Sequence, residues 1–275
     1  GREDKGLAPP LVGSKDKGLA PPSLPGKGAG GLGTDENLFE QLKAIAPVRR
    51  DEPLARHVTF GIGGPADLFV TVRSADELAR AVVAARNAGA PLFILGAGSN
   101  ILVGDGGIRG VVIDNQAKRV EGPTERGSEW LVRAESGVAF ATLARHLAKD
   151  GYGGIEWASG IPGSLGGAAV YNAGAYGGCL ADVLRSVTML LADGTQREVQ
   201  AADLKLAYRG SIFTRGECAG CVVLALSFAV TPGDPASLLR RIEEIDEQRL
   251  AAQPRGRNGG STFKNPDGHH AWELI

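Results

Sequence analysis

The architecture of this chain can be worked out from Gly160-Ile-Pro-Gly-Ser-Leu-Gly-Gly167, the centre of its most glycine-rich part. Ten of the 28 residues from 151 to 178 are glycine, against 41 in all 275 residues. Glycine loses more backbone freedom on folding than any other residue, so this density is costly. Apolar residues such as Trp157 and Leu165 argue against a flexible linker, which is the alternative. We therefore interpret the stretch as backbone packed closely on a flat or phosphorylated ligand.

A second glycine motif, Leu95-Gly-Ala-Gly-Ser-Asn-Ile101, directly follows a predicted strand at 91–95. Its two glycines would let backbone amides approach a pyrophosphate, and Ser99 and Asn100 add side-chain donors. The third glycine of the dinucleotide fingerprint G-x-G-x-x-G is missing, and no acidic ribose ligand follows at its usual distance. An ordinary turn after a strand remains the alternative.

From residue 38 onward the hydrophobic pattern predicts a mixed α+β fold in two blocks. Strands are predicted where apolar and β-branched residues cluster, at 68–72, 91–95, 111–113, 130–134, 187–191, 196–199 and 221–230. Helices are predicted after Ser74, at 139–149, and from Pro235 to about Leu250. Asp193-Gly194 predicts a hairpin between two of the strands. Ser74 and Glu77 form a capping-box pattern at a helix start.

The first 37 residues have the composition of a disordered tail. Asp4-Lys-Gly-Leu-Ala-Pro-Pro10 recurs as Asp16-Lys-Gly-Leu-Ala-Pro-Pro22. Such a low-complexity segment cannot bury enough apolar surface to offset its ordering entropy. A short proline-rich ligand for a partner protein is the alternative.

Composition excludes several classes of function. A net charge of −1 gives no electrostatic source for nucleic-acid binding. The longest apolar stretch, 221–230, is too short to span a bilayer, so we expect no membrane insertion. Three cysteines form no disulfide framework, which favours a cytoplasmic location. Cys218-x-x-Cys221 lacks the second ligand pair of a zinc site, so we expect it to be idle and predict no metal.

Three further positions could carry chemistry. Tyr208-Arg-Gly-Ser-Ile-Phe213 would place a permanent cation and a phenol beside a turn, although an exposed arginine is usually only solvated. Ser261 follows two glycines in Asn258-Gly-Gly-Ser-Thr-Phe-Lys-Asn-Pro266, where an ordinary turn serine is the alternative. Arg249 falls on the apolar face of its predicted helix, so it either snorkels to solvent or faces an anion.

Taken in order, these motifs resemble those of the bacterial UDP-N-acetylenolpyruvoylglucosamine reductases. Thr59-Phe-Gly-Ile-Gly-Gly-Pro-Ala66 is similar to that family's N-terminal signature, and the four motifs above match its later signatures in the same order. The resemblance covers about residue 40 to the end of the chain. It implies the shorter family type, which lacks an extra tyrosine-bearing loop.

The resemblance implies a fold in which two subdomains hold FAD, as in flavoproteins of the vanillyl-alcohol-oxidase (PCMH) type, followed by an α+β substrate-binding domain. We accordingly predict a tail at 1–37, the first FAD subdomain at 38–114, the second at 115–252, and the start of an incomplete substrate domain at 253–275. A monomer is expected.

The resemblance also implies an activity. NADPH would reduce the flavin, and hydride would pass to the enolpyruvyl double bond of UDP-N-acetylglucosamine enolpyruvate, giving UDP-N-acetylmuramate for peptidoglycan. Ser261 matches the proton donor and Arg209 the arginine that polarises the enolpyruvyl carboxylate. Substrate contacts would come from Tyr208, Arg209, Arg249 and Asn265. The implied cofactor contacts are Gly96, Ala97, Gly98, Ser99, Asn100, Ile101, Ile161, Pro162, Gly163, Ser164, Gly166, Gly167, Asn172, Gly174 and Tyr176.

One feature of the family has no counterpart in this sequence. Its third catalytic residue is a glutamate that would lie beyond Ile275, so we expect weakened catalysis if the polypeptide ends there. Two other hypotheses therefore stay open. One is another FAD oxidoreductase of the same fold, and the other is a catalytically impaired fragment that binds flavin or a nucleotide sugar.

Overall fold

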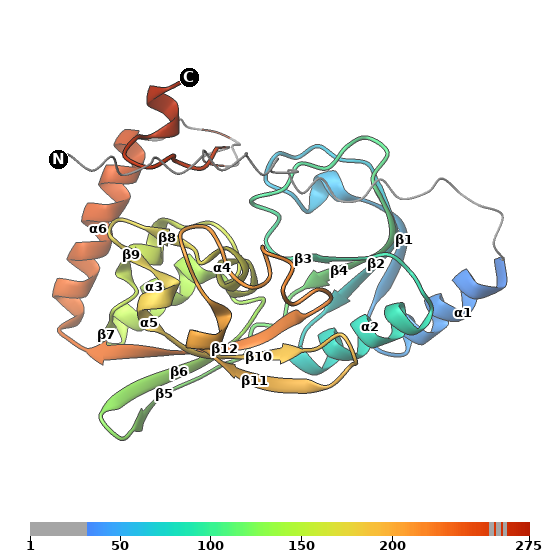
Figure 1. The fold of residues 1–275 in the computed structure, drawn as a ribbon, viewed down its shortest axis with the longest axis horizontal. Coiled ribbons are helices and arrows are strands. Elements are labelled where there is room, and N and C mark those ends of the chain that lie inside the picture. The colour runs from blue at the N-terminus through green and yellow to red at the C-terminus, as the bar shows by residue number, and fades with distance from the viewer. Residues whose placement is uncertain (1–31, 253–255, 257–259, 261–262) are drawn as a thin grey trace, which may run out of the picture. The chain divides into compact units, whose positions relative to one another are not determined.

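The computed structural model describes residues 32–252, Gly256, Gly260 and 263–275 (Figure 1). The predicted tail at 1–37 therefore lies almost wholly outside the described residues. Helix α1 (Leu32–Lys43) nevertheless begins within that predicted segment. Leu38 and Leu42 are buried on it and join the core beside helix α2 (Ala75–Asn87). The helix itself starts at Leu32, before the boundary that we predicted at residue 38.

The first sheet has four strands in the order β1-β2-β4-β3. Their bounds are β1 Val48–Pro53, β2 Pro65–Val72, β3 Leu92–Leu95 and β4 Ile108–Asn115. β1 runs antiparallel to β2, whereas β2 and β3 both run parallel to β4. The carboxyl ends of β3 and β4 therefore lie side by side, and the glycine motif at 95–101 leaves the sheet at this edge.

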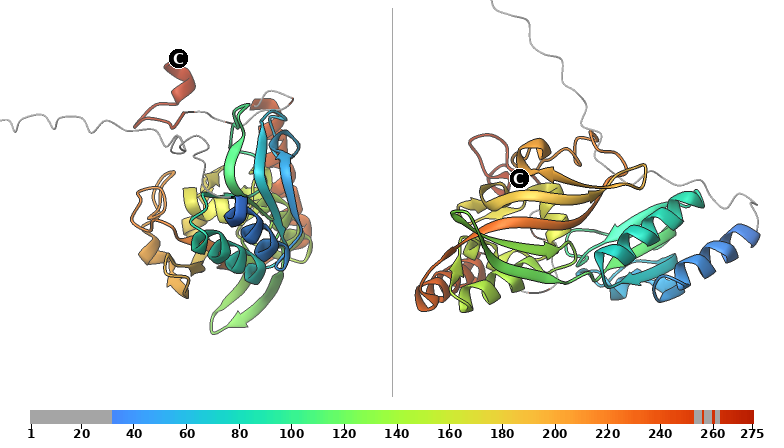
Figure 2. Two further views of the ribbon diagram at one scale, coloured as in Figure 1. Left: turned by 90° about the vertical axis from the view of Figure 1, so that its right-hand side faces the viewer. Right: turned by 90° about the horizontal axis from the view of Figure 1, so that it is seen from below.

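Helix α2 connects β2 to β3 and covers this sheet, with α1 beside it (Figures 1 and 2). The predicted start is confirmed, because the Ser74 hydroxyl oxygen accepts a hydrogen bond from the Glu77 N–H at 3.1 Å. The Glu77 carboxylate reaches one residue further back than a capping box requires and accepts from the Arg73 N–H at 2.7 Å. Gly89, with φ +64°, follows the end of the helix.

The second sheet is antiparallel, in the order β11-β10-β12-β6-β5, and β7 pairs with the end of β12. Its strands are β5 Val120–Arg126, β6 Glu129–Glu135, β7 Tyr152–Gly153, β10 Leu184–Leu190, β11 Gln196–Gln200 and β12 Val222–Pro232. The hairpin predicted at Asp193-Gly194 is confirmed by the antiparallel pairing of β10 and β11.

Helices and short turns complete the second block. Helix α3 (Phe140–Lys149) and helix α6 (Pro235–Ala252) pack on each other and on the 3₁₀ turn η2 (Glu156–Gly160). In the sequence, η2 and α6 are separated by α4 Leu165–Tyr171, the small hairpin of β8 Gly174–Ala175 and β9 Gly178–Cys179, and α5 Leu180–Val183, together with the strands β10 to β12. The remaining 3₁₀ turns are η1 Leu54–Arg56, η3 Ala201–Leu204 and η4 Ala271–Glu273.

A shared apolar core joins the two sheets. Leu190, Val222 and Leu224 belong to strands of the second sheet, yet they pack in one cluster with the buried residues of α1, α2, β2 and β4. Arg86, near the end of α2, adds polar contacts across the same boundary. Its guanidinium donates to the Leu191 carbonyl at 2.8 Å and to the Gly220 carbonyl. The two blocks thus pack as one compact unit.

The cysteine pair departs from our expectation. Cys218 and Cys221, which we had predicted to be idle, are joined in a disulfide. A turn in which the Cys221 N–H donates to the Cys218 carbonyl at 3.1 Å brings the two Cα atoms to 5.5 Å, within bonding range. Spacing alone indicated no metal site and gave no reason to expect this turn. Cys179 remains a free thiol.

The described residues contain neither a candidate membrane span nor a candidate metal cluster. Across 32–252 and 263–275, no helix combines the length and apolar character needed to cross a membrane. Nor do the described His, Cys, Asp and Glu side chains gather in any group of three or more that could hold a metal ion.

Replacing Leu224 by alanine tests the shared core. Leu224 is 1% exposed, and removing such a buried side chain costs about 2–5 kcal/mol. We expect a lower melting temperature in a single thermal transition followed by circular dichroism. Leu250→Ala is the control, since Leu250 is 69% exposed and its loss should be nearly neutral. Two separate transitions in the Leu224 variant would contradict the shared core.

Candidate functional site

The two glycine motifs, far apart in sequence, meet in the structure. The Ser99 hydroxyl, on the loop after β3, donates to the Pro162 carbonyl at 3.2 Å. A Cβ added at Gly163 would lie 3.3 Å from the Ser99 hydroxyl, and one added at Gly96 would overlap the hydroxyl of Ser164. The first sheet therefore brings its loop directly against the segment that leads into α4.

Backbone amides line this junction without protein partners. Within the described part of the chain, the N–H groups of residues 97–100 donate to no protein acceptor, and the same holds for those of Gly163 and Ser164. Successive unpaired amides in a glycine-rich loop are the donors that phosphate oxygens require. The residues present therefore fit the diphosphate of a dinucleotide cofactor such as FAD.

Several glycines of these segments also have a role in the packing of the protein itself. At Gly98, with φ +63°, a Cβ would overlap the His57 carbonyl oxygen, and at Gly178 it would overlap the Trp157 ring. At Gly166 it would lie 3.2 Å from Ser136. Protein atoms, rather than a ligand, thus exclude side chains at these positions. The density of glycine brings backbone segments together and so forms the site indirectly.

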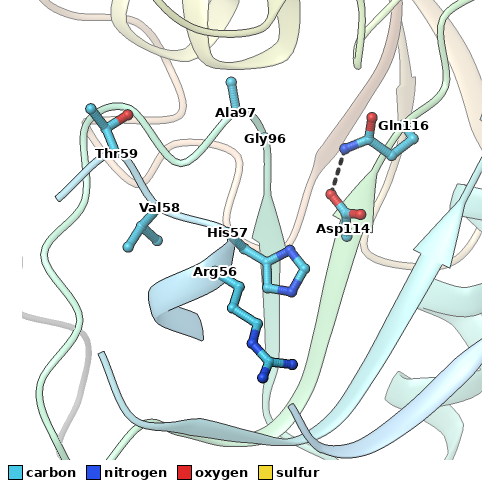
Figure 3. Close-up of a pocket in the computed structure, with 8 residues that line it drawn as sticks. All are labelled: Arg56, His57, Val58, Thr59, Gly96, Ala97, Asp114 and Gln116. Atoms are coloured by element: carbon cyan, nitrogen blue, oxygen red, sulfur yellow. Dashed lines mark hydrogen bonds between the residues drawn. The ribbon is translucent and has the colours of Figure 1, made fainter. Parts of the chain in front are cut away.

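A polar pocket of about 340 Å³ adjoins the first loop (Figure 3). It is lined by Arg56, His57, Val58, Thr59, Gly96, Ala97, Asp114 and Gln116. Asp114, at the carboxyl end of β4, accepts from the Gln116 side chain at 2.7 Å, and both face the pocket (Figure 3). Sequence reasoning missed Arg56, His57, Asp114 and Gln116. A signal for Asp114 and Gln116 was available in the sequence. Parallel strands place their carboxyl ends at one edge of a sheet, and ligands bind at that edge.

Glu52 orients the imidazole of His57 in this pocket. Its carboxylate, 6% exposed, lies 2.8 Å from the His57 Nε2 and accepts from Arg49 at 3.2 Å. The His57 ring also packs on Phe69, with centroids 4.3 Å apart. The hydrogen bond with His57 is the main cause that holds the pKa of Glu52 below its usual value, against the opposing effect of burial.

The Tyr208-Arg209 motif forms the tip of a two-residue turn. Ala207 and Gly210 exchange backbone hydrogen bonds at 3.0 and 3.1 Å, and Arg209 has φ +50°, which is uncommon for a residue with a side chain. The half-buried Arg209 guanidinium donates to the Gly174 carbonyl at 3.2 Å, its one hydrogen bond among the described residues. Most of its donors therefore remain available to a carboxylate.

Arg249 lies close to Gly160 and to Tyr176, the residue between strands β8 and β9. It is half-buried on α6, on the face that also carries the buried Ile242 and Ile245, as predicted. A Cβ at Gly160 would lie 3.3 Å from the Arg249 side chain and 3.6 Å from the ring of Tyr176. No ion pair or hydrogen bond of Arg249 is present within the described part of the chain. This cation is thus available to an anion near Tyr176.

The remaining predicted substrate residues are only partly placed. Tyr208 is 62% exposed, and its hydroxyl oxygen accepts from the Asn265 backbone N–H at 3.4 Å, so these two predicted residues lie together. The Asn265 side chain bonds instead to Ala271 N–H at 3.0 Å. Ser261, the predicted proton donor, lies outside the described residues.

Asn172 was predicted as a cofactor contact, but its side chain is occupied elsewhere. It is 7% exposed, donates to the Ala207 carbonyl at 3.0 Å and accepts from the Ala181 N–H at 2.9 Å. The Gly166 N–H likewise has a protein partner, since it donates to the Ser136 carbonyl at 2.8 Å. Tyr176 and Gly177 both have positive φ, at +51° and +85°, the pattern of a tight hairpin turn. This turn presents the Tyr176 ring beside Arg249.

Known proteins share both the fold and the site segments. Residues 66–200 match a family model described as an FAD binding domain. A UDP-N-acetylenolpyruvoylglucosamine reductase of Lachnoclostridium phytofermentans is 38% identical over 244 residues, which is 86% of this chain and 77% of that protein. One from Phenylobacterium zucineum is 41% identical over 227 residues, covering 82% and 74%.

The chain belongs to the UDP-N-acetylenolpyruvoylglucosamine reductase family. The crystal structure of the Thermus caldophilus enzyme (MurB) agrees, with a TM-score of 0.69 and 31% identity over 84% of this chain and 79% of that one. The predicted family and the predicted FAD-binding fold are therefore confirmed. Both glycine segments lie within residues 66–200, the part of the chain that matches the FAD binding domain.

Replacing Gly98 by alanine tests the junction. The new Cβ would overlap the His57 carbonyl, and φ +63° is unfavourable for alanine, so we expect a loss of more than about 1 kcal/mol of stability together with weakened FAD binding. Flavin content after purification and the melting temperature measure both effects. Gly104→Ala is the matched control, since a Cβ there meets no atom within 4 Å. Equal flavin content in the two variants would argue against this role of Gly98.

The Glu52–His57 pair predicts an acid-dependent stability. Because the folded-state pKa of Glu52 is lowered, its stabilisation is complete above the ordinary carboxyl pKa of about 4.3 and is lost as the pH falls through the folded-state value. The melting temperature of the Glu52→Gln variant should be lower than wild type at neutral pH and should fall less on acidification. Parallel curves for the two proteins below about pH 5 would contradict this assignment.

Proposed function

We propose that this chain is a flavoenzyme that uses NADPH to reduce the enolpyruvyl group of UDP-N-acetylglucosamine enolpyruvate, giving UDP-N-acetylmuramate for peptidoglycan synthesis. The observation that carries the proposal is the conjunction of two features. Unpaired amides at residues 97–100, Gly163 and Ser164 suit the diphosphate of FAD. Two half-buried arginines without acidic partners among the described residues, Arg209 and Arg249, suit an anionic substrate.

Each part of the cofactor has a chemically suitable place. The amides at the loop junction would hold the diphosphate, and the polar pocket beside it would take the nucleoside end, with Asp114 accepting from hydroxyl groups and Arg56 near the phosphates. FAD, when bound, would supply the hydride chemistry that links NADPH to the substrate. Residues of the protein then need only bind, orient and exchange a proton.

Arg209 is proposed to bind the enolpyruvyl carboxylate. Its planar guanidinium suits that group bidentately, and it would stabilise the negative charge that develops beside the carboxylate when hydride adds to the double bond. Tyr208 and Asn265, held together by one hydrogen bond, are proposed to contact the nucleotide sugar. Arg249 is proposed to face a second anionic group of the same substrate. Ser261 is proposed as the proton donor on the strength of the family resemblance alone.

The proposal keeps the cytoplasmic location and the monomeric state predicted from the sequence. Native mass measurement in solution tests this point directly.

The decisive experiment follows the flavin spectrum. Purified protein given FAD should be yellow, should bleach with NADPH in the absence of oxygen, and should recover its colour when the enolpyruvyl UDP-sugar is added. Bleaching without recovery would indicate a different acceptor and thus another oxidoreductase of the same fold. A preparation that takes up no FAD from an excess would end the proposal.

Arg209→Gln should lower kcat/KM for the UDP-sugar by roughly 10²-fold or more, because a fixed charge on the developing anion is lost. Flavin content should stay unchanged, since the hydrogen bond that Arg209 makes within the described residues goes to Gly174 and not to the loop junction. Arg197→Gln on the exposed face of β11 is the control and should retain full activity. Steady-state kinetics and flavin absorbance distinguish these outcomes, and an unimpaired Arg209 variant would exclude its assigned role.

A further inference from the structure

Helix α4 connects the cofactor segment to the arginine turn. At its start, Leu165 and Gly166 donate backbone hydrogen bonds to the Val138 and Ser136 carbonyls at 2.9 and 2.8 Å, directly after Gly163 and Ser164. The helix has only the residues Leu165–Tyr171, so its two ends are about 10 Å apart at 1.5 Å per residue. The end of the helix is therefore fixed relative to the loop junction.

Two buried polar side chains tie that end to the turn. Asn172, the C-terminal cap of α4, donates through its side-chain nitrogen to the Ala207 carbonyl at 3.0 Å. Ser211, fully buried, donates its hydroxyl to the Val170 carbonyl at 2.6 Å. Ala207 and Ser211 flank the turn Tyr208–Gly210, so α4 holds it from both sides.

The turn needs such support, because its central residue is strained. Arg209 has φ +50°, a conformation that persists only where the surrounding structure enforces it. Asn172 itself adopts φ +44° and ψ +62°, which asparagine tolerates better than most residues. Two left-handed residues are thus joined through one short side-chain bridge, and the position of the guanidinium depends on it.

We propose that Asn172 is a positioning residue that sets Arg209 at a fixed distance from the cofactor loop, with Ser211 as the second attachment. The inference rests on the proposed function, in which Arg209 binds the substrate carboxylate. It also revises our prediction for Asn172, whose side chain bonds to the turn and to Ala181. Losing the bridge should impair substrate use while FAD stays bound.

Asn172→Gly tests the bridge in the full chain loaded with FAD. Glycine accepts the positive φ, so the variant removes the side-chain bonds without adding backbone strain. We expect kcat/KM for the enolpyruvyl UDP-sugar to fall by about tenfold or more, because small displacements of a binding cation are costly. The dissociation constant of FAD should stay within about twofold of wild type, because α4 remains attached at Leu165 and Gly166.

Asn115→Ala is the matched control for a general loss of stability. Asn115 is 5% exposed, donates to the Ser136 hydroxyl at 2.8 Å and accepts from the Ala117 N–H at 3.1 Å. It thus loses the same kinds of bonds as Asn172→Gly without touching the turn. Its melting temperature should fall, whereas the KM for the UDP-sugar at saturating FAD should remain that of wild type.

Asn172→Asp serves if the glycine variant does not fold. The carboxyl can still accept from the Ala181 N–H, but only its protonated form can donate to the Ala207 carbonyl. Its deficit in kcat/KM relative to wild type should therefore shrink as the pH is lowered.

Three outcomes would overturn the inference. They are an unchanged kcat/KM in both Asn172 variants, an equal loss of kcat/KM in Asn115→Ala, and a loss of FAD binding that accounts for the whole effect. A wild-type protein that ignores the UDP-sugar would instead refute the proposed function, so the two failures are distinguishable.

Discussion

The close approach of two backbone segments is the constraint on which the rest of the site depends. The loop after β3 reaches the segment before α4, and the Ser99 hydroxyl donates to the Pro162 carbonyl at 3.2 Å. This proximity requires the absence of a side chain at Gly96, where a Cβ would overlap Ser164. At Gly98 the same loop packs against His57, and a Cβ there would overlap the His57 carbonyl. The loop after β3 and the segment before α4, each with unpaired amides, therefore lie in contact.

This constraint explains why the two sheets share a core. A loop junction built from two blocks keeps its geometry only if the blocks do not move against each other. Leu190, Val222 and Leu224 pack among the residues of α2 and the first sheet, and Arg86 adds hydrogen bonds across the boundary. The apolar contacts and the polar clamp thus preserve the spacing that a diphosphate requires, although none of these residues lies at the junction.

Regular elements were predictable from the sequence because their signals are local. The Ser74 cap, the Asp193-Gly194 hairpin and the Asp234-Pro235 helix start each depend on neighbours within a few residues. Features that depend on long-range contact were missed. Asp114 and Gln116 became pocket residues only because β4 lies beside β3. The Cys218–Cys221 disulfide is a local contact between residues three apart, and it was missed because the spacing alone does not reveal the turn that joins them.

Asn172 and the glycines show a further limit of reasoning from motifs. Both stand in segments that resemble cofactor-binding signatures, and we predicted Asn172 and most of these glycines as cofactor contacts. In the structure several of the glycines allow other protein atoms to approach closely. The Asn172 side chain donates to the Ala207 carbonyl and accepts from the Ala181 N–H. A sequence motif can therefore be typical of a ligand site because its residues form the protein structure around the ligand, even where they do not contact the ligand themselves. The turn at Arg209 is the clearest example. Its left-handed conformation is unfavourable by itself and is held by a hydrogen bond between the turn and α4.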